Sequence, residues 1–502
     1  MPLPPHDAWR DGQNLNPNSF FTVSQSLPGF PAFLFFALAN SCRSSRSSSV
    51  SRSSRRTALA RAVWRSSLGR RAERLLFLAM VVLTSGCTFS LRFSPDSSRM
   101  WELRPVQAGG CLMCPPAPSS LSAFALTMLT LLAWLAAGQA ETPEKRYVRT
   151  KQGERPKPMM AVDNACAWPN LTVLRDGTIV ATLFNAPYHA NIVGDVDCWA
   201  SEDGGRTWRK RGTPAPHDPP ISNRMNVAAG LARNGDLIVI SSGWLLEAPR
   251  KPPEGVPPGY ASLVRILDPW VCRSSDGGRT WTIDKQAFPA QTAFGGPPVP
   301  FGDIVFGQDG TLRVAAYAKP TGIHKVESAM TPRVRRAYVY RSRDDGTTWG
   351  EPVALDDGKS CSETALLHLG QSQWLAAART IGEGLQLYES RDDARTWTNR
   401  MRLPADGYPG HFLRLRDGRL LLSFGSRSGV DRATKVLWSR DDGKTWSGPV
   451  FVVDYRLDGG YPSSVQLPDG NVLTAYYARE ADYHGRYHMG VVIWHPETSL
   501  GR

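Results

Sequence analysis

Three features are scarce in this sequence of 502 residues, and each scarcity argues against a class of protein. Residues 141–502 hold four cysteines, none spaced like metal ligands and none in a Cys-x-x-Cys pair, which argues against a structural zinc site. The same region has no apolar repeat at helical spacing, which argues against a helical fold. Its 45 basic and 40 acidic residues nearly cancel. The net charge of +14 therefore comes mainly from residues 1–140 and gives little reason to expect a nucleic-acid partner.

The first 140 residues are predicted to be a leader rather than part of the fold. Residues 121–137 are an unbroken apolar run, and Gly138 and Ala140 place small residues at the −3 and −1 positions of a signal-peptidase site. A run of 17 residues is at the short limit for a membrane span, so a signal peptide is favoured over a retained anchor.

A signal peptide stands at the N-terminus, which indicates a native start at Met100 or Met113. We expect residues 1–112 to be a non-native or disordered extension and residues 113–140 to be the signal peptide. Residues 141–502 are then an exported domain, periplasmic or secreted, without a stable membrane span.

Export bears on the state of the cysteines. The pair closest in sequence after residue 140 is Cys166 and Cys198, and an oxidising compartment permits a disulfide between them. Four buried free thiols are nevertheless the expected state of Cys166, Cys198, Cys272 and Cys361.

One pattern, Ser-x-Asp-x-Gly-x-Thr-Trp, recurs five times in the last 300 residues and indicates a chain built from repeats. Its Asp and Ser or Thr can hydrogen-bond backbone N–H groups across a tight turn, its Gly permits a positive φ, and its Trp can pack between neighbouring units. We expect these boxes to hold turns and to contact no substrate. They are Ser201–Trp208, Ser274–Trp281, Ser342–Trp349, Ser390–Trp397, where Ala394 replaces the Gly, and Ser439–Trp446.

A second repeated element consists of an apolar strand, a tight turn and another apolar strand, and Asp-Gly or Asn-Gly turns of this kind predict hairpins. Each copy continues into a third strand and, in five cases, a box turn and a fourth strand. Six such four-stranded units predict an all-β, six-bladed β-propeller. The sixth unit has no box, and we expect an N-terminal strand near Tyr147 to complete it. The six copies are residues 169–184, 228–240, 303–317, 365–379, 411–425 and 464–477.

Alternating strand direction places the Asp-Gly turns and the boxes on one face of the propeller, so we expect the functional site on the opposite face. Arginines there suit bidentate binding of a carboxylate. A Tyr beside a Glu suits attack on an anomeric carbon, because the Glu can take the phenolic proton. The candidates are His189, Asp195, Arg224, Asp303, Glu363, Arg379, His411, Arg427, Arg432 and Tyr461.

The boxes and several of these candidates resemble the sialidases over about residues 160–497. Tyr461, in Gly-Tyr-Pro-Ser-Ser, is similar to the segment of the family's nucleophile, with one Pro inserted. Glu363, 16 residues before Arg379, resembles the family's paired Glu and second triad arginine, and Arg432 resembles the third. The resemblance implies a retaining exo-glycosidase with Tyr461 as nucleophile, tuned by Glu363, and with no cofactor or metal.

Two departures from the family pattern leave the sugar open. Ala167 stands where the family has its first triad arginine, and Arg224 or Arg427 is the expected replacement. The acid/base Asp is also missing from its usual place, so His189 or Asp195 is the candidate for that role. The predicted partner is a glycan or small acidic sugar: sialic acid, another nonulosonic acid or a uronic acid, or else a different sugar.

Two other functions stay open. One is a propeller that binds glycans without catalysis, because propellers host many functions. The other is a polysaccharide lyase or hydrolase that uses His189 or His411 as its base. The geometry discriminates among them: a sialidase-type mechanism requires Tyr461 and Glu363 within hydrogen-bond reach of each other.

Overall fold

The computed structural model describes residues 89–93, 101–105 and 145–500, apart from residues 190, 192, 219–220, 247–263, 321–322, 326–333, 428–430 and 482–483. Contacts divide the chain into two units, Met1–Pro143 and Glu144–Arg502. In the first unit, strands β1 (Phe89–Phe93) and β2 (Trp101–Pro105) form an antiparallel hairpin. The expected signal peptide, residues 113–140, lies outside the described residues.

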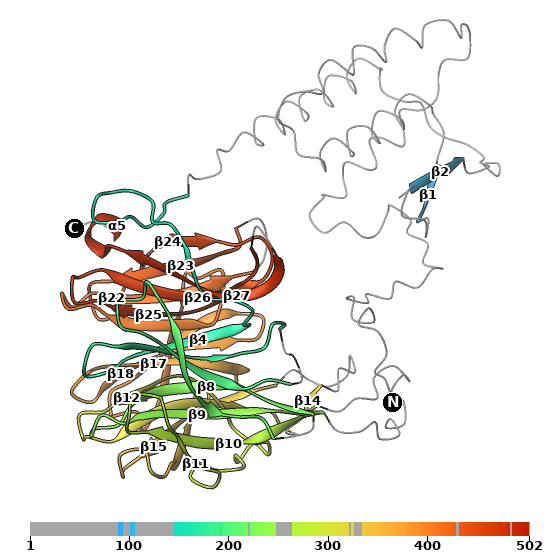
Figure 1. Cartoon of the computed structure of the whole chain (residues 1–502). Coiled ribbons are helices and arrows are strands. Elements are labelled where there is room, and N and C mark those ends of the chain that lie inside the picture. The colour runs from blue at the N-terminus through green and yellow to red at the C-terminus, as the bar shows by residue number, and fades with distance from the viewer. Residues whose placement is uncertain are drawn as a thin grey trace, which may run out of the picture. The chain divides into compact units, whose positions relative to one another are not determined.

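The second unit is built from antiparallel sheets, and four of these are separate four-stranded blades (Figure 1). The first contains β4 (Ala167–Val173), β5 (Ile179–Phe184), β6 (Val196–Ser201) and β7 (Arg209–Ala215). The second contains β17 (Cys361–Gly370), β18 (Gln373–Thr380), β19 (Gly384–Ser390) and β20 (Thr398–Arg402). The third contains β21 (Gly410–Arg414), β22 (Leu420–Ser426), β23 (Ala433–Ser439) and β24 (Ser447–Asp454). The fourth contains β25 (Gly459–Gln466), β26 (Val472–Ala481), β27 (His484–Trp494) and β3 (Met159–Val162).

The remaining strands form one nine-stranded sheet in place of two separate blades. One part contains β8 (Ser222–Leu231), β9 (Leu237–Leu246), β10 (Val264–Ser274), β11 (Thr282–Asp284) and β14 (Ile323–Lys325). The other contains β12 (Val299–Phe306), β13 (Leu312–Ala318), β15 (Arg336–Ser342) and β16 (Gly350–Ala354).

The propeller class is confirmed, but six separate sheets are not found, because β8 and β12 pair in parallel. The pairing joins Gly302 to Ala228 and Asp303 to Ala229. Gly230 permits this approach, since a Cβ on it would lie 2.7 Å from the backbone oxygen of Ile304.

The strand that closes the last blade is not the one expected near Tyr147. Strand β3, Met159–Val162, pairs with β27, whereas Tyr147 forms an isolated bridge with Phe451. A short C-terminal helix, α5 (Pro496–Leu500), follows β27. No helix among the described residues is long and apolar enough to cross a membrane.

The box turns have the expected hydrogen bonds, as the second box shows. Asp276 accepts hydrogen bonds from the Ser274 hydroxyl at 2.7 Å and from the Thr280 hydroxyl at 2.6 Å. The Ser274 oxygen accepts the N–H of Gly278 at 2.8 Å, and the Trp281 indole donates to the Gly278 carbonyl at 3.1 Å. The serine, aspartate and threonine of each box therefore stabilise its own turn.

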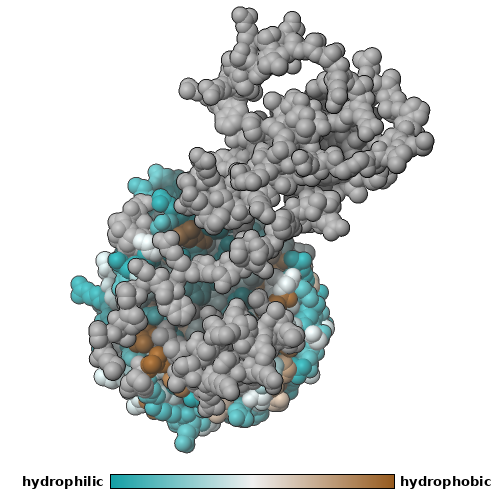
Figure 2. Space-filling model, turned by 90° about the vertical axis from the view of Figure 1, so that its right-hand side faces the viewer, coloured by the Kyte–Doolittle hydropathy of each residue, from teal (hydrophilic) through white to brown (hydrophobic). Residues whose placement is uncertain are grey.

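Buried side chains form the interior of the propeller, and the cysteines are among them. Cys166, Cys198, Cys272 and Cys361 are buried thiols, as expected, and no disulfide links Cys166 to Cys198. On the face shown in Figure 2, the coloured surface is mostly hydrophilic and hydrophobic residues form small separate patches.

Candidate active site

Tyr461 and Glu363 meet on the face opposite the boxes. Tyr461 stands near the start of β25, and Glu363 stands near the start of β17. The Tyr461 hydroxyl donates to Glu363 Oε1 at 2.7 Å, which is the contact that a sialidase-type mechanism requires. Arg379, near the end of β18, donates from Nη1 to the same oxygen at 2.9 Å. The structure thus brings together three candidates that are up to 98 residues apart.

The two partners are held in opposite protonation states. Burial, with the Glu363 carboxylate adding to it, raises the pKa of Tyr461 above its ordinary value of 10. Burial alone would also raise the pKa of Glu363, but the nearby guanidinium groups of Arg379 and Arg335 outweigh it and lower this pKa to about 2. A neutral phenol therefore faces an ionised carboxylate.

Three arginines surround this pair. Arg379 stacks on Tyr408, with its Cζ 4.1 Å from the ring centroid, and the Cζ of Arg427 lies 4.9 Å from the centroid of Tyr461. Arg427 Nε donates to a backbone carbonyl, while its Nη2 and Glu363 Oε2 are buried without a hydrogen-bond partner. Arg335 contributes positive charge from just before β15. Unused donors beside the phenol suit the binding of an anionic group.

Aromatic side chains also surround the phenol. The Trp168 ring centroid lies 5.7 Å from that of Tyr461, 5.7 Å from that of Phe184 and 5.0 Å from that of His189. Ala167, Trp168 and Tyr461 have positive φ values of 54°, 45° and 46°. Such strain in residues other than glycine is typical of functional sites. The indole thus lines the first blade's side of the site, next to Ala167, which stands at the family's arginine position.

His189 is held beside these aromatic side chains by a carboxylate. Its Nδ1 lies 2.9 Å from Asp458 Oδ2, and the same oxygen accepts hydrogen bonds from Tyr477 at 3.0 Å and Tyr487 at 2.9 Å. Burial alone would raise the pKa of Asp458, but its hydrogen bond to His189 and the charge of Arg427 lower it below the usual range. An ionised carboxylate only accepts hydrogen bonds, so the imidazole proton lies on Nδ1 and Nε2 is the free ring nitrogen.

The other candidates Asp195, Arg224 and Arg432 contact residues other than Tyr461 and Glu363. Asp195 Oδ1 accepts from the backbone N–H of His217 at 2.8 Å and lies 2.6 Å from its Nδ1. Arg224 is buried with its Cζ 3.5 Å from the centroid of Trp270, and burial lowers its pKa to about 10. Arg432 donates to the backbone carbonyl of Arg456 at 2.9 Å. None of these contacts involves Tyr461 or Glu363.

Asp303 and His411 belong to a network that joins β12 of the nine-stranded sheet to the first strands of three blades, β4, β21 and β25. His411 Nε2 lies 3.2 Å from Asp303 Oδ2 and 3.1 Å from the Ser463 hydroxyl. Its Nδ1 accepts the N–H of Ser464 at 3.3 Å, and Asn170 donates to Asp303 at 2.9 Å. With both ring nitrogens engaged, His411 is poorly placed to act as a base.

Sequence reasoning missed Asp458 and Arg335 as site residues. Asp458 stands three residues before Tyr461, which is a signal that was available. Arg335 immediately precedes a third strand, and third strands begin on the face that carries the site. Among the described residues, no group of three or more His, Cys, Asp or Glu side chains could hold a metal ion.

Comparison with known proteins gives one family match and several similar structures. The family model for the BNR repeat-like domain matches residues 258–474. Over these residues, which are less than half of its length, the chain contains a BNR repeat-like domain. No curated protein matches it.

The solved structures similar to this BNR-repeat propeller include sialidases. A protein of unknown function from Dyadobacter fermentans is 25% identical, with a TM-score of 0.56 over 67% of this chain and 97% of its own. A Hadza microbial sialidase, Hz136, is 17% identical, with a TM-score of 0.50 over 67% of both chains. Trypanosoma rangeli sialidase is 16% identical, with a TM-score of 0.49 over 71% of this chain and 58% of its own.

Proposed function

We propose that this protein is an exported exo-glycosidase of sialidase type that hydrolyses a terminal acidic sugar from a glycan. The observation that carries the proposal is the 2.7 Å hydrogen bond between Tyr461 and the ionised Glu363, beside Arg379. A phenol is a weak nucleophile, and an adjacent carboxylate activates it by accepting its proton.

The proposed reaction consists of two displacements at the anomeric carbon, in which Tyr461, Glu363 and an acid/base take part. The Tyr461 oxygen attacks the anomeric carbon as its proton passes to Glu363, and the bond to the leaving oxygen breaks while that oxygen takes a proton from the acid. Water then attacks the glycosyl–tyrosine carbon and loses a proton to the same acid/base, and the tyrosine recovers its proton from Glu363. Two displacements at one carbon retain its configuration.

The surroundings of Tyr461 support an acidic pyranose as the substrate. Arg335, Arg379 and Arg427 supply positive charge near the phenol, and Trp168 supplies an apolar surface beside it. A neutral phenol avoids the repulsion that an anionic sugar would meet from a carboxylate nucleophile.

His189 is the proposed acid/base. Asp458 orients the ring through Nδ1 at 2.9 Å. The imidazolium form gives its Nε2 proton to the leaving oxygen, and the neutral ring that results takes a proton at Nε2 from the attacking water. Asp195 is less suitable, because His217 occupies its Oδ1.

The proposal is tested by hydrolysis of aryl glycosides by the full chain. The panel contains sialic acid, other nonulosonic acids, uronic acids and the neutral hexoses. We expect turnover of at least one acidic glycoside and none of the neutral ones, because Arg335, Arg379 and Arg427 outnumber the nearby carboxylates of Glu363 and Asp458 and favour an anionic group. Binding of acidic glycans without turnover would instead support a glycan-binding propeller.

A His189→Ala variant is expected to lose activity according to the leaving group. With a poor leaving group, kcat/KM falls by about a hundredfold or more, because general acid catalysis is lost. With a strongly activated nitrophenyl leaving group, which departs without a proton, glycosylation falls by less than about tenfold. Equal losses with both leaving groups, measured by steady-state and burst kinetics, would contradict the acid role. His217→Ala is the matched control, and it should leave both rates within about twofold.

A further inference from the structure

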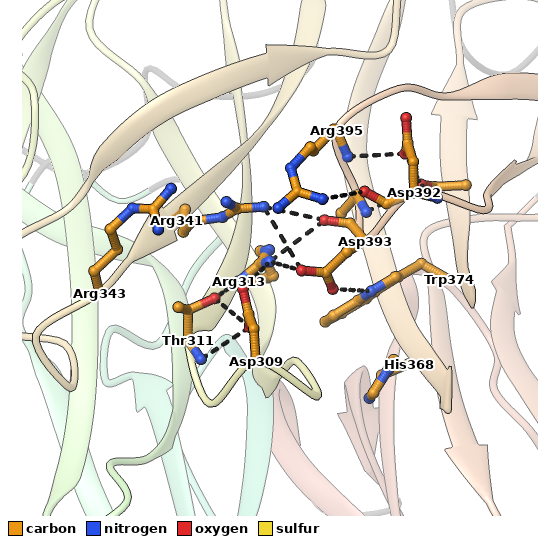
Figure 3. Close-up of polar contacts among 12 residues, drawn as sticks. Asp309, Thr311, Arg313, Arg341, Arg343, His368, Trp374, Asp392, Asp393 and Arg395 are labelled. Carbon is orange, nitrogen blue, oxygen red and sulfur yellow. Dashed lines mark hydrogen bonds and ion pairs between the residues drawn. The ribbon is translucent and has the colours of Figure 1, made fainter. Parts of the chain in front are cut away.

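A cluster of arginines lies on the box side of the propeller, where the β12–β16 part of the nine-stranded sheet meets the box turn of the β17–β20 blade. Arg313 on β13 and Arg341 on β15 are cross-strand neighbours, and both are buried. Arg343 stands in the third box and Arg395 in the fourth. We call these four residues the arginine seam (Figure 3).

The seam interrupts a regular packing scheme. At two other boxes a leucine of a second strand packs against the box glycine of a neighbouring blade: a Cβ on Gly205 would lie 2.7 Å from Leu473, and one on Gly443 would lie 2.8 Å from Leu375. At the corresponding place in β13 the residue is Arg313, and the box it reaches is the one in which Ala394 replaces the glycine.

Arg313 finds its partner in that box. Its Nη2 donates to Asp393 Oδ2 at 2.7 Å, and the other carboxylate oxygen accepts the Trp374 indole N–H at 3.0 Å. Arg341 Nη2 donates to the Asp393 carbonyl at 3.1 Å. In Figure 3, the guanidinium groups of Arg341 and Arg395 point toward one another near the ion pair of Arg313 and Asp393.

A cavity of about 140 Å³ opens at this place. Four guanidinium groups and a single carboxylate, that of Glu351, line it together with Val339, Val353 and Ala394. Arg313 is 1% exposed, and its Nε is buried without a hydrogen-bond partner. The side-chain contact of Arg395 is with the carbonyl of Asp392, at 3.0 Å, so its guanidinium keeps unused donors.

We propose that the arginine seam binds a tetrahedral oxyanion, either a sulfate or phosphate ester on a larger molecule or the free ion. Arg343 binds Glu351 at 2.6 and 3.0 Å, and Arg341 Nη1 lies 3.6 Å from the same carboxylate, so two guanidinium groups share one acidic partner. Arg341 and Arg395 face each other across the cavity, where an anion between them relieves their mutual repulsion. Guanidinium groups that converge from two strands and a turn suit oxygens spread tetrahedrally better than the coplanar pair of a carboxylate.

The seam is independent of the proposed catalytic site, because the two lie on opposite faces of the propeller. Titration calorimetry of the full chain with sodium sulfate and sodium phosphate, at constant ionic strength, tests the proposal. Saturable binding is expected, and Arg395→Gln should weaken it by about tenfold or more, since a charge-assisted contact is lost. Arg395 is exposed, so the variant is expected to fold.

Arg279→Gln is the matched control. Arg279 occupies the same position in the second box and makes the same contact, to the carbonyl of Asp276 at 2.6 Å, but lies outside the seam. Its replacement should leave the affinity within about twofold. Absence of saturable binding, equal effects of the two variants, or acetate binding as tightly as sulfate would each overturn the proposal.

A sulfated oligosaccharide and its desulfated form distinguish the two sources of the anion. Tighter binding of the sulfated form than of free sulfate, lost in Arg395→Gln, would assign the site to an ester on a polymer. Binding of the inorganic ions alone, with the same loss, would assign it to the free ion.

Discussion

A Tyr461→Phe variant is expected to lose at least about a thousandfold in kcat on every glycoside that the protein hydrolyses. Phenylalanine keeps the ring, and with it the contacts to Trp168 and Arg427, at centroid distances of 5.7 and 4.9 Å. It removes the oxygen that hydrogen-bonds Glu363 and that forms the bond to the sugar. Substrate binding should survive, so KM or the affinity for a substrate analogue should change by less than about fivefold.

Tyr477→Phe is the control for this experiment. The Tyr477 ring centroid lies 5.8 Å from that of Tyr461, but its hydroxyl donates to Asp458 and not to Glu363. We expect its kcat to fall by no more than about tenfold. A Tyr461→Phe variant with more than one tenth of the wild-type kcat would rule out the tyrosine as nucleophile.

Most of the fold could be predicted because its signals are local. Each box encodes its turn within eight residues, as the hydrogen bonds among Ser274, Asp276 and Thr280 show. The Asp-Gly and Asn-Gly turns of the second repeated element mark hairpins that the structure contains. The pairing of β8 with β12 could not be predicted, because it depends on the contact of Gly230 with Ile304, far along the chain.

Site residues could be predicted where their position at a strand end brings them together. They could not be predicted where the contact depends on the direction of a side chain. Tyr461, Glu363 and Arg379 stand at strand ends on one face, so their meeting follows from the topology. Arg427 and Arg432 are five residues apart after β22. The sequence alone does not show that the Arg427 guanidinium lies beside Tyr461 and that of Arg432 beside the Arg456 carbonyl. The anchoring of His189 by Asp458 links two connecting segments 269 residues apart.

Asp393→Asn is expected to lower the free energy of unfolding by about 3–5 kcal/mol. The carboxylate is the closest acidic partner of Arg313, at 2.7 Å, and the guanidinium is 1% exposed. Removing the negative charge leaves the buried guanidinium with Asp309, which lies 3.3 Å away and is itself 34% exposed, as its remaining acidic partner. Backbone strain does not account for the effect, because asparagine tolerates the φ of 63° that Asp393 adopts. Chemical denaturation followed by tryptophan fluorescence measures the change.

The double variant Arg313→Leu/Asp393→Asn separates the charge from the packing. It places at β13 the aliphatic residue type of Leu375 and Leu473, so we expect it to recover stability to within about 1 kcal/mol of wild type. Asp442→Asn, at the same position in the fifth box, is the control: its carboxylate is 57% exposed, and the change should be under about 0.5 kcal/mol. If Asp393→Asn lowered the free energy of unfolding no more than Asp442→Asn does, the buried pair of Arg313 and Asp393 would not be a source of stability. If the double variant were as unstable as Asp393→Asn, the loss would come from packing and not from the unpaired arginine.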